Sequence, residues 1–317
     1  MQKKQTEIIP AQPYAFGQAL AYIRTSPSSI LEKIDDHGYH RVFTFTDQPV
    51  LVQMNHEGSI DNARLKVEVI GDHVDAAILN QAVDTLKRIF CLTVDPEPFH
   101  LLTVKDPILG GQMSSYRGLR PVLIGDPFEA LVWAIIGQQI NITFAKKLKL
   151  KLQGLCGDTF HFNGKSYPVF PKPEQIIALG EEKLRENQFS RQKAQYLITA
   201  SRAVASGDID FEALTHMSYD KACQSLMQFK GLGRWTAEYV LMRGLGFQDI
   251  IPAGDLGLQD IIGQFYKHGK RATEDEVRQI AKAWSPWRSW AAFVWWLQLQ
   301  LAHFVEQKHR SGVISDE

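Results

Sequence analysis

One carboxylate, Asp255, stands in the sequence Pro-Ala-Gly-Asp-Leu-Gly-Leu (252–258), where the preceding glycine lets the backbone turn sharply. A preorganised carboxylate lowers the energy of a transition state that develops positive charge, and it can also orient a water molecule. The alternative is that Asp255 only caps a helix beginning at Leu256. Both roles can coexist, because helix N–H groups that bond a carboxylate favour its ionised form. If Asp255 is idle, Asp249 is the first alternative.

A Gly-x-Gly turn precedes this carboxylate and could bind a phosphate. Gly231 and Gly233 can leave backbone N–H groups unpaired at the start of the next helix, where the helix dipole adds positive potential. Leu232, between them, is expected to point back between the two helices. Apolar residues recur at helical spacing behind Ser218, a candidate N-cap, and again after the turn until Gly244. The segment therefore predicts a helix, a hairpin and a second helix.

The elements that must position these residues fall into two parts. Residues 40 to 70 alternate in the manner of strands and are followed by a helix with an apolar face, which predicts a small α/β domain over residues 1–111. From about residue 112 the pattern turns helical, which predicts a mainly helical domain over residues 112–317. The fold class expected is therefore α+β.

Several local signals divide the helical part. Asp126-Pro-Phe-Glu129 is a capping-box variant that predicts a helix start, and Gly137-Gln-Gln-Ile-Asn141 predicts a break between two helices. Residues 154 to 173 are typical of a loop or small hairpin. A second capping box begins at Thr273, and the last long helix is expected after Pro286.

The Gly-x-Gly turn with an Asp at this offset resembles the helix-hairpin-helix (HhH-GPD) superfamily of DNA glycosylases, and within it the 3-methyladenine DNA glycosylase II family. The resemblance includes Gly125-Asp-Pro-Phe-Glu129, Ile136-Gly-Gln-Gln-Ile140 and Trp284-Ser-Pro-Trp-Arg-Ser-Trp290. It covers roughly residues 115 to 305 with specific motifs, and the first hundred residues only by position and pattern. It implies a TATA-binding-protein-like α/β domain in front of a helical catalytic domain.

The resemblance assigns roles to individual residues. Asp255 becomes the catalytic carboxylate, and Trp235, Tyr239 and Trp296 line the base pocket. Gln139, beside Gln138, becomes the wedge that fills the gap left by a flipped base. As an alternative, the two glutamines only satisfy backbone groups at a helix end. The phosphate-binding hairpin comprises Lys230, Gly231, Leu232, Gly233 and Arg234. The same carbonyl-rich hairpin is expected to hold a monovalent cation, and no other cofactor or metal is predicted.

The substrate implied is an alkylated purine in double-stranded DNA. Alkylation at N3 or N7 makes a purine cationic, and electron-rich aromatic faces attract cations. Six of the seven tryptophans lie between residues 235 and 296, although Trp284, Trp287 and Trp290 are expected in the core. Trp295 and Trp296 face opposite sides of one helix, so only one of them is expected to line the pocket.

Strand cleavage is not expected. Relatives that also cut the strand carry a lysine where this chain has Trp235, so we expect base release by water alone. Two alternatives stay open: a glycosylase for oxidised or deaminated bases, and a DNA-binding protein without catalysis.

Composition limits the remaining choices. Lys plus Arg and Asp plus Glu both number 35, so DNA contacts must be local. Three scattered cysteines suggest a reducing compartment and exclude the four-cysteine iron-sulfur loop of some relatives. The sequence shows no signal core or apolar span, which predicts a cytoplasmic, nucleoid-associated protein without a membrane partner. A monomer is the default expectation. Candidate DNA-contacting clusters, each with a solvated surface as its alternative, are Lys146, Lys147, Lys149 and Lys151; Arg185, Arg191 and Lys193; and Lys267, Lys270 and Arg271.

Overall fold

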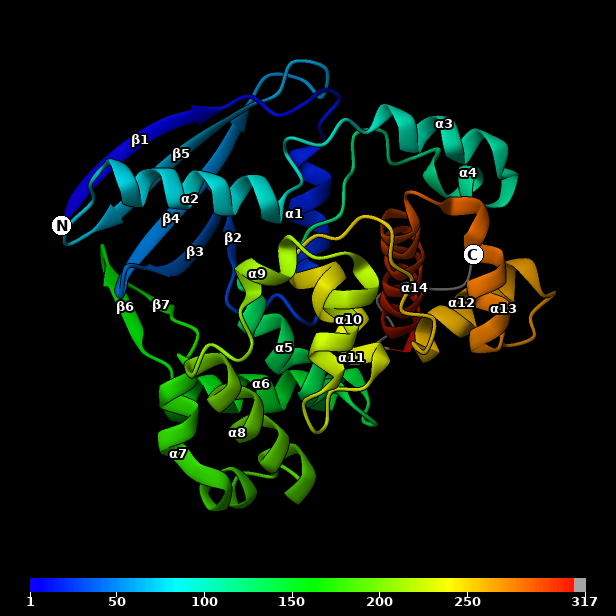
Figure 1. Ribbon diagram of the computed structural model, residues 1–317. Helices are drawn as coiled ribbons and strands as arrows, with labels where there is room; N and C mark the ends of the chain where they lie inside the picture. The colour runs from blue at the N-terminus through cyan, green and yellow to red at the C-terminus, as the bar shows by residue number, and fades with distance from the viewer. Residues whose placement is uncertain (311–317) are drawn as a thin grey trace.

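The N-terminal part of the molecule is a five-stranded antiparallel sheet (Figure 1). The computed structural model describes residues 1–310, and side chains as far as residue 301. The strand order is β1-β5-β4-β3-β2, so the chain forms a meander whose first strand joins the far edge. In the centre of the sheet, Val52 pairs with Arg41 on one side and with Val69 on the other. The strands are β1 (Gln2–Ile8), β2 (Lys33–Asp35), β3 (Gly38–Phe45), β4 (Gln48–Glu57) and β5 (Arg64–Gly71).

Both faces of this sheet are covered. Helices α1 (Phe16–Thr25) and α2 (Ala76–Ile89) belong to the main core together with the inward-facing side chains of β4 and β5. The opposite face, which carries Leu51 and Ile70, packs against β6 (Thr159–Phe162) and β7 (Lys165–Pro168). This hairpin lies between two helices of the helical part, so a segment from that part covers the N-terminal sheet.

The rest of the described chain is helical, as the sequence predicts. Helix α11 continues directly into η1, a turn of π-helix in which the N–H of Leu245 bonds the carbonyl of Val240. The elements are α3 (Glu97–Lys105), α4 (Pro107–Met113), α5 (Pro127–Gly137), α6 (Ile142–Cys156), α7 (Pro173–Glu186), α8 (Arg191–Ala205), α9 (Phe211–Thr215), α10 (Tyr219–Met227), α11 (Arg234–Tyr239), η1 (Val240–Gly244), α12 (Leu256–Tyr266), α13 (Glu274–Ala281), η2 (Lys282–Trp284) and α14 (Arg288–Arg310).

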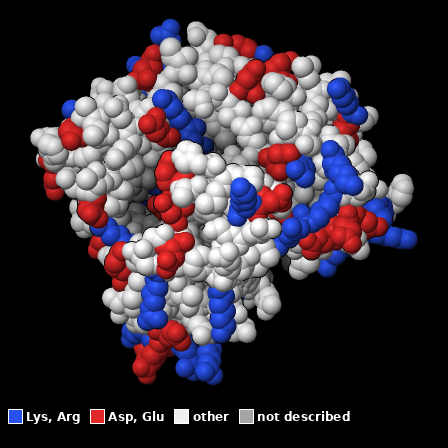
Figure 2. Space-filling view, in the orientation of Figure 1, with Lys and Arg blue, Asp and Glu red and all other residues white. Residues whose placement is uncertain are grey.

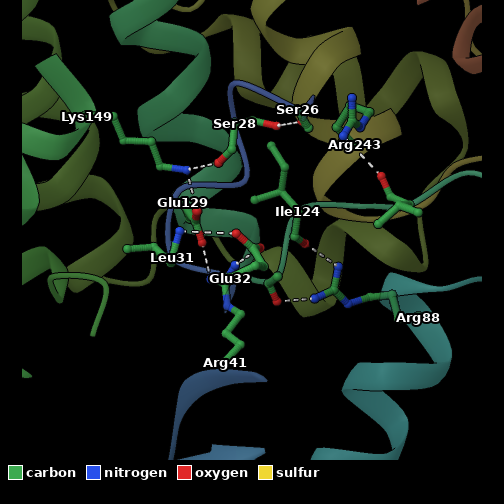
Figure 3. A network of polar contacts seen from close by, with 12 residues as sticks. Ser26, Ser28, Leu31, Glu32, Arg41, Arg88, Ile124, Glu129, Lys149 and Arg243 are labelled. Atoms are coloured by element: carbon green, nitrogen blue, oxygen red, sulfur yellow. Dashed lines mark hydrogen bonds and ion pairs between the residues drawn. The ribbon is translucent and has the colours of Figure 1, made fainter. Parts of the chain in front are cut away.

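Helix α5 lies in the core of the helical part, since every residue from Phe128 to Ile136 is buried. Asp126 caps it and Pro127 takes the first helical position, as expected. The capping box is nevertheless incomplete. Glu129 turns away from the N-cap because Arg41 of β3 and Lys149 of α6 reach its carboxylate from different sides (Figure 3). Buried cations compete more strongly for a carboxylate than one backbone N–H does.

The expected strands, hairpin, helix break and Thr273 capping box are confirmed. Helices α3 and α4 come earlier than the predicted helical onset. Helix α4 packs against α14, and its N-cap Asp106 accepts the hydroxyl of Tyr266 at 2.7 Å and the indole N–H of Trp284 at 2.9 Å. The division at residues 111 and 112 stays a prediction.

Candidate active site

Asp255 is the N-cap of α12 and accepts three N–H groups. Its Oδ1 accepts the backbone N–H of Leu258 at 2.9 Å and the indole N–H of Trp296 at 3.2 Å. Its Oδ2 accepts the indole N–H of Trp235 at 3.1 Å. The capping role expected from the sequence is therefore confirmed, and the same half-buried carboxylate joins two indole rings.

Two opposing effects determine the pKa of Asp255. Burial raises the pKa of this carboxyl above its ordinary value of 3.8, and the three N–H donors oppose the rise. The sequence argument considered only the donors, so it missed the larger effect of desolvation. Within the part of the chain that the structure describes, no Lys or Arg forms an ion pair with Asp255. Its negative charge is stabilised by dipoles and is not neutralised by a cation.

Three aromatic rings gather beside this carboxylate, and together they form the aromatic site: Trp235, Tyr239 and Trp296. The ring centroids of Trp235 and Tyr239 lie 5.5 Å apart, and those of Tyr239 and Trp296 lie 5.7 Å apart. Trp235 and Tyr239 are four residues apart on α11 and so share one helix face. Helix α14 supplies Trp296. The site therefore combines residues of α11 and α14 with the N-cap of α12.

The other tryptophans of the C-terminal part are core residues. Trp284 and Trp295 are fully buried and pack with each other and with Tyr266. Trp287 and Trp290 pack with Phe99 of α3. Trp296, in contrast, contacts Tyr239 and Asp255, and the expectation that only one of Trp295 and Trp296 lines the pocket stays a prediction.

The neighbouring acids are committed to ion pairs. Asp249 accepts the Nε and Nη2 of Arg288 at 2.6 and 2.9 Å, and Asp260 pairs with Arg271. Asp255 is thus distinguished from Asp249, the alternative that the sequence offered, and from Asp260 by its aromatic surroundings. Across the residues described by the structure, no three His, Cys, Asp or Glu side chains gather where they could hold a metal ion.

The hairpin between α10 and α11 has the predicted form. Leu232 is buried between the helices, whereas Lys230 and Arg234 are exposed. The two glycines differ. Gly231 has φ +92°, and a Cβ there would lie 2.3 Å from the ring of Tyr196, so only glycine fits. A Cβ at Gly233 would meet open space, so internal packing does not require glycine there.

The break between α5 and α6 gives its two glutamines different environments. Gln138 donates its side-chain N–H groups to the carbonyl of Gly231 at 2.8 Å and to Thr236 Oγ1 at 3.1 Å. Gln139 is exposed and has φ +56°, an unusual backbone conformation for a residue other than glycine.

Lys193 of α8 holds this break in place. Its buried ammonium donates to the carbonyl of Gln138 and to that of Ile135 at 3.4 Å. It thereby satisfies the C-terminal carbonyls of α5. A groove of about 750 Å³ runs beside these residues, between the glutamine break, the start of α8 and the hairpin.

The basic clusters predicted from the sequence separate into internal and surface members. Lys149 and Lys193 are buried, and Lys267 and Arg271 are paired with acids of their own surface. Lys146, Lys147, Arg185, Arg191 and Lys270 are exposed. Figure 2 shows cations and anions interspersed over the visible face, without a large area of one sign.

Sequence reasoning missed three residues at this site. Arg243 lies one turn after Tyr239 and within 6.0 Å of its ring centroid, a placement that the helical spacing could have suggested. Tyr22 comes from α1 and faces Arg243 at 5.8 Å, and no local signal could place it there. Lys193 was predicted to contact DNA or to lie on a solvated surface, and not to bond the carbonyls at the end of α5.

Comparison with known proteins shows the family of this chain. Residues 132–286 match the model of the HhH-GPD superfamily of base excision DNA repair proteins. The chain is 33% identical over 279 residues to the DNA-3-methyladenine glycosylase of Bacillus subtilis, which covers 87% of this chain and 91% of the relative. The chain therefore belongs to the HhH-GPD superfamily of base excision DNA repair proteins, on the 3-methyladenine glycosylase side of it.

Solved structures extend the match to the whole fold. The 3-methyladenine DNA-glycosylase of Archaeoglobus fulgidus has a TM-score of 0.80 at 26% identity, over 93% of this chain and 98% of that one. The Schizosaccharomyces pombe 3-methyladenine DNA glycosylase in complex with abasic DNA has a TM-score of 0.51 at 28% identity, over 62% of this chain and 93% of that one. Within residues 1–310, no helix has both the length and the apolar character needed to cross a membrane.

Proposed function

We propose that this protein is a monofunctional DNA glycosylase that releases alkylated purines of the 3-methyladenine class from double-stranded DNA, as the first step of base excision repair. The observation that carries the proposal is the carboxylate of Asp255, held between the indole N–H groups of Trp235 and Trp296. It acts as a monomer on the chromosomal DNA of the nucleoid. The named relatives support the substrate class.

Asp255 serves the sugar side of the reaction. As the bond between C1′ and the purine breaks, positive charge develops on the deoxyribose, and a fixed carboxylate stabilises that charge. The indole and backbone N–H donors fix the orientation of Asp255 before the substrate binds, so little reorganisation is needed in the transition state. Water adds its oxygen to C1′ and releases a proton.

The absence of an amine at position 235 excludes the lyase route through the usual lysine. Trp235 offers only an indole N–H, and that group already bonds Asp255. Lys230 is exposed on the hairpin, before the turn. Water is therefore the nucleophile, and the product is an abasic site in an uncut strand.

The DNA contacts are assigned to the hairpin and the glutamine break. The hairpin from Lys230 to Arg234 presents backbone N–H groups to a phosphate, and the open space at Gly233 permits close approach. Gln139 enters the stack in place of the flipped base, whereas Gln138 fastens the break to the hairpin. The neutral hairpin carbonyls, including that of Phe229, fit a monovalent cation, which would add positive potential towards the phosphate.

The test is to incubate the protein with methylated duplex DNA and to identify released bases by chromatography, with strand cleavage assayed with and without alkali. Release of 3-methyladenine or 7-methylguanine, with cleavage only after alkali, is the expected result. Strand cleavage without alkali, together with borohydride trapping of the protein on DNA, would contradict the monofunctional assignment. No release by a folded protein that binds DNA would contradict the substrate class.

A further inference from the structure

A buried guanidinium lies against the aromatic site. Arg243 of η1 is 4% exposed, and its Cζ lies 5.6 Å from the ring centroid of Trp296 and 6.0 Å from that of Tyr239. Its Nη2 donates to the carbonyl of Val122 at 3.1 Å, the contact drawn in Figure 3. Two of the three rings assigned to the base pocket therefore already contact a cation of the protein.

The charge of Arg243 is not cancelled locally. A guanidinium stays protonated at any pH that a protein tolerates. Its guanidinium contacts the carbonyl of Val122 and the rings of Tyr22, Tyr239 and Trp296, and among the described residues its Nε has no hydrogen-bond partner. Within the described residues, Arg243 forms no ion pair with a carboxylate. The positive electrostatic potential of Arg243 is therefore felt at the aromatic site.

Trp296 contacts both charges of the site. Its indole N–H donates to Asp255, and its ring lies against Arg243. Trp296 thus contacts a negative group through its N–H and a positive group through its ring. If the base stacks on these rings and the sugar faces Asp255, this arrangement favours movement of electrons from sugar to base.

We propose that Arg243 is a specificity-determining residue that favours release of neutral purines relative to cationic ones, an inference that rests on the proposed function. When the C1′–N bond breaks, its electron pair goes to the purine nitrogen, and water supplies hydroxyl to C1′. A neutral purine becomes negative and then takes a proton from water, whereas a cationic purine becomes neutral and the proton of water goes to solvent. Positive charge behind the rings stabilises the first purine and repels the second.

The expected size follows from Coulomb's law. A base stacked on the face of the Trp296 ring that points away from the guanidinium would lie about 9 Å from it. The two substrate classes differ by one unit of charge on the base. With effective dielectric constants between about 20 and 80, removal of the Arg243 charge changes the ratio of their rates roughly 2- to 20-fold.

The experiment compares wild type, Arg243→Met and Arg243→Lys. We would measure kcat/KM for duplexes that contain 7-methylguanine, which is cationic, or hypoxanthine, which is neutral. The ratio of the two values from one protein sample does not depend on the fraction that is folded. We expect the cationic-to-neutral ratio to rise roughly 2- to 20-fold in Arg243→Met and to stay near wild type in Arg243→Lys.

The outcomes separate this inference from the proposed function. If wild type releases neither base and also fails to release 3-methyladenine, the proposed function is wrong. If it releases 3-methyladenine alone, the role of Arg243 is wrong and the proposed function stands. If wild type releases 7-methylguanine but no hypoxanthine, or if Arg243→Met leaves the ratio unchanged, the role of Arg243 is wrong while the glycosylase assignment stands. An equal change of the ratio in Arg243→Met and Arg243→Lys would show that packing, and not charge, determines it.

Discussion

Two carboxylates of this molecule, Glu129 and Asp255, are held in opposite ways. Glu129 is fully buried and lies between Arg41 and Lys149, which keep its pKa below the ordinary value despite desolvation. Asp255 is held by N–H dipoles alone, and its pKa is raised. A carboxylate whose charge is cancelled by cations holds two parts of the chain together. One whose charge is left uncancelled keeps a field that can act on a substrate.

Replacing each carboxylate by its amide tests this contrast. The largest effect, on base release, is expected at Asp255. Asp255→Asn keeps the shape and the N-cap but removes the charge. We expect base release to fall at least about 10³-fold, because the developing charge on the sugar loses its counter-charge. DNA binding should be kept or improved, since a negative group near phosphates is gone. Single-turnover base release and DNA affinity check both expectations.

Asp249→Asn is the matched control for this experiment. It breaks the ion pair with Arg288 but leaves the aromatic site intact, so it should lower stability without abolishing base release. An equal loss of DNA binding and base release in a folded Asp255→Asn protein would contradict the assignment of Asp255.

Glu129→Gln should have the opposite effect to Asp255→Asn, because it should lower stability and leave base release unchanged. Removing this charge leaves Lys149 buried without its carboxylate partner, and breaking a buried ion pair costs about 3–5 kcal/mol of unfolding free energy. The protein that remains folded should release bases at the wild-type rate, because Glu129 does not touch the aromatic site. Urea unfolding gives the first quantity and single-turnover kinetics the second. Unchanged stability would mean that the cluster does not join the sheet to α5.

The two carboxylates should also respond to pH in different directions. The pKa of Glu129 is lowered, so its stabilisation is present above its unfolded value of about 4.5 and is lost as pH falls through the folded pKa. The pKa of Asp255 is raised, so its contribution to stability is present below the unfolded value of 3.8 and is lost as pH rises through the folded pKa. Ionised Asp255 therefore costs stability at neutral pH.

As the pH is lowered, base release should therefore decrease at a higher pH than the one at which the protein unfolds. Base release needs ionised Asp255 and should decrease as pH falls through a pKa above 3.8. Wild type and Asp255→Asn should become equally stable below that pKa, while the variant should be more stable than wild type at pH 7. Unfolding free energies and release rates across the pH range check this. A variant that is less stable only at neutral pH would contradict the sign.

The contrast also shows what the sequence could and could not predict. Asp255 and Trp235 could be singled out because a motif of fixed spacing carries them on two adjacent elements. Glu129 was assigned to a local capping box, since nothing near it in sequence indicates that Arg41, 88 residues earlier, would compete for it. Strand β1 was missed because its exposed, polar residues lack the alternation that marks a half-buried strand.

The same limit applies to the residues behind the aromatic site. Tyr22 reaches Arg243 from a helix of the N-terminal part, and only the tertiary fold sets that distance. The role of the N-terminal part could not be inferred from its own sequence. In the structure it supplies Arg41 to the helix that ends at the glutamine break, and Tyr22 to the neighbourhood of the aromatic site.

The smallest effects are expected at the glutamine break. Gln139→Ala should slow base release from duplex DNA about tenfold, because unstacking a base costs a few kcal/mol and the gap is then left unfilled. Release from single-stranded DNA should not change, since no stack has to be repaired. Gln192→Ala, which alters an exposed glutamine of the same groove, is the matched control and should leave both rates near wild type.

Lys193→Met sharpens the same test. The ammonium of Lys193 holds the carbonyl of Gln138, so its loss should free the break and reduce the duplex rate by a smaller factor than Gln139→Ala does. If Lys193 acts by positioning Gln139, its substitution should have no further effect in a Gln139→Ala background. Additive losses in the double variant, or an equal loss on single-stranded DNA, would mean that Lys193 supports the helical fold in general. The double variant therefore shows whether Lys193 acts by positioning Gln139 or by stabilising the end of α5.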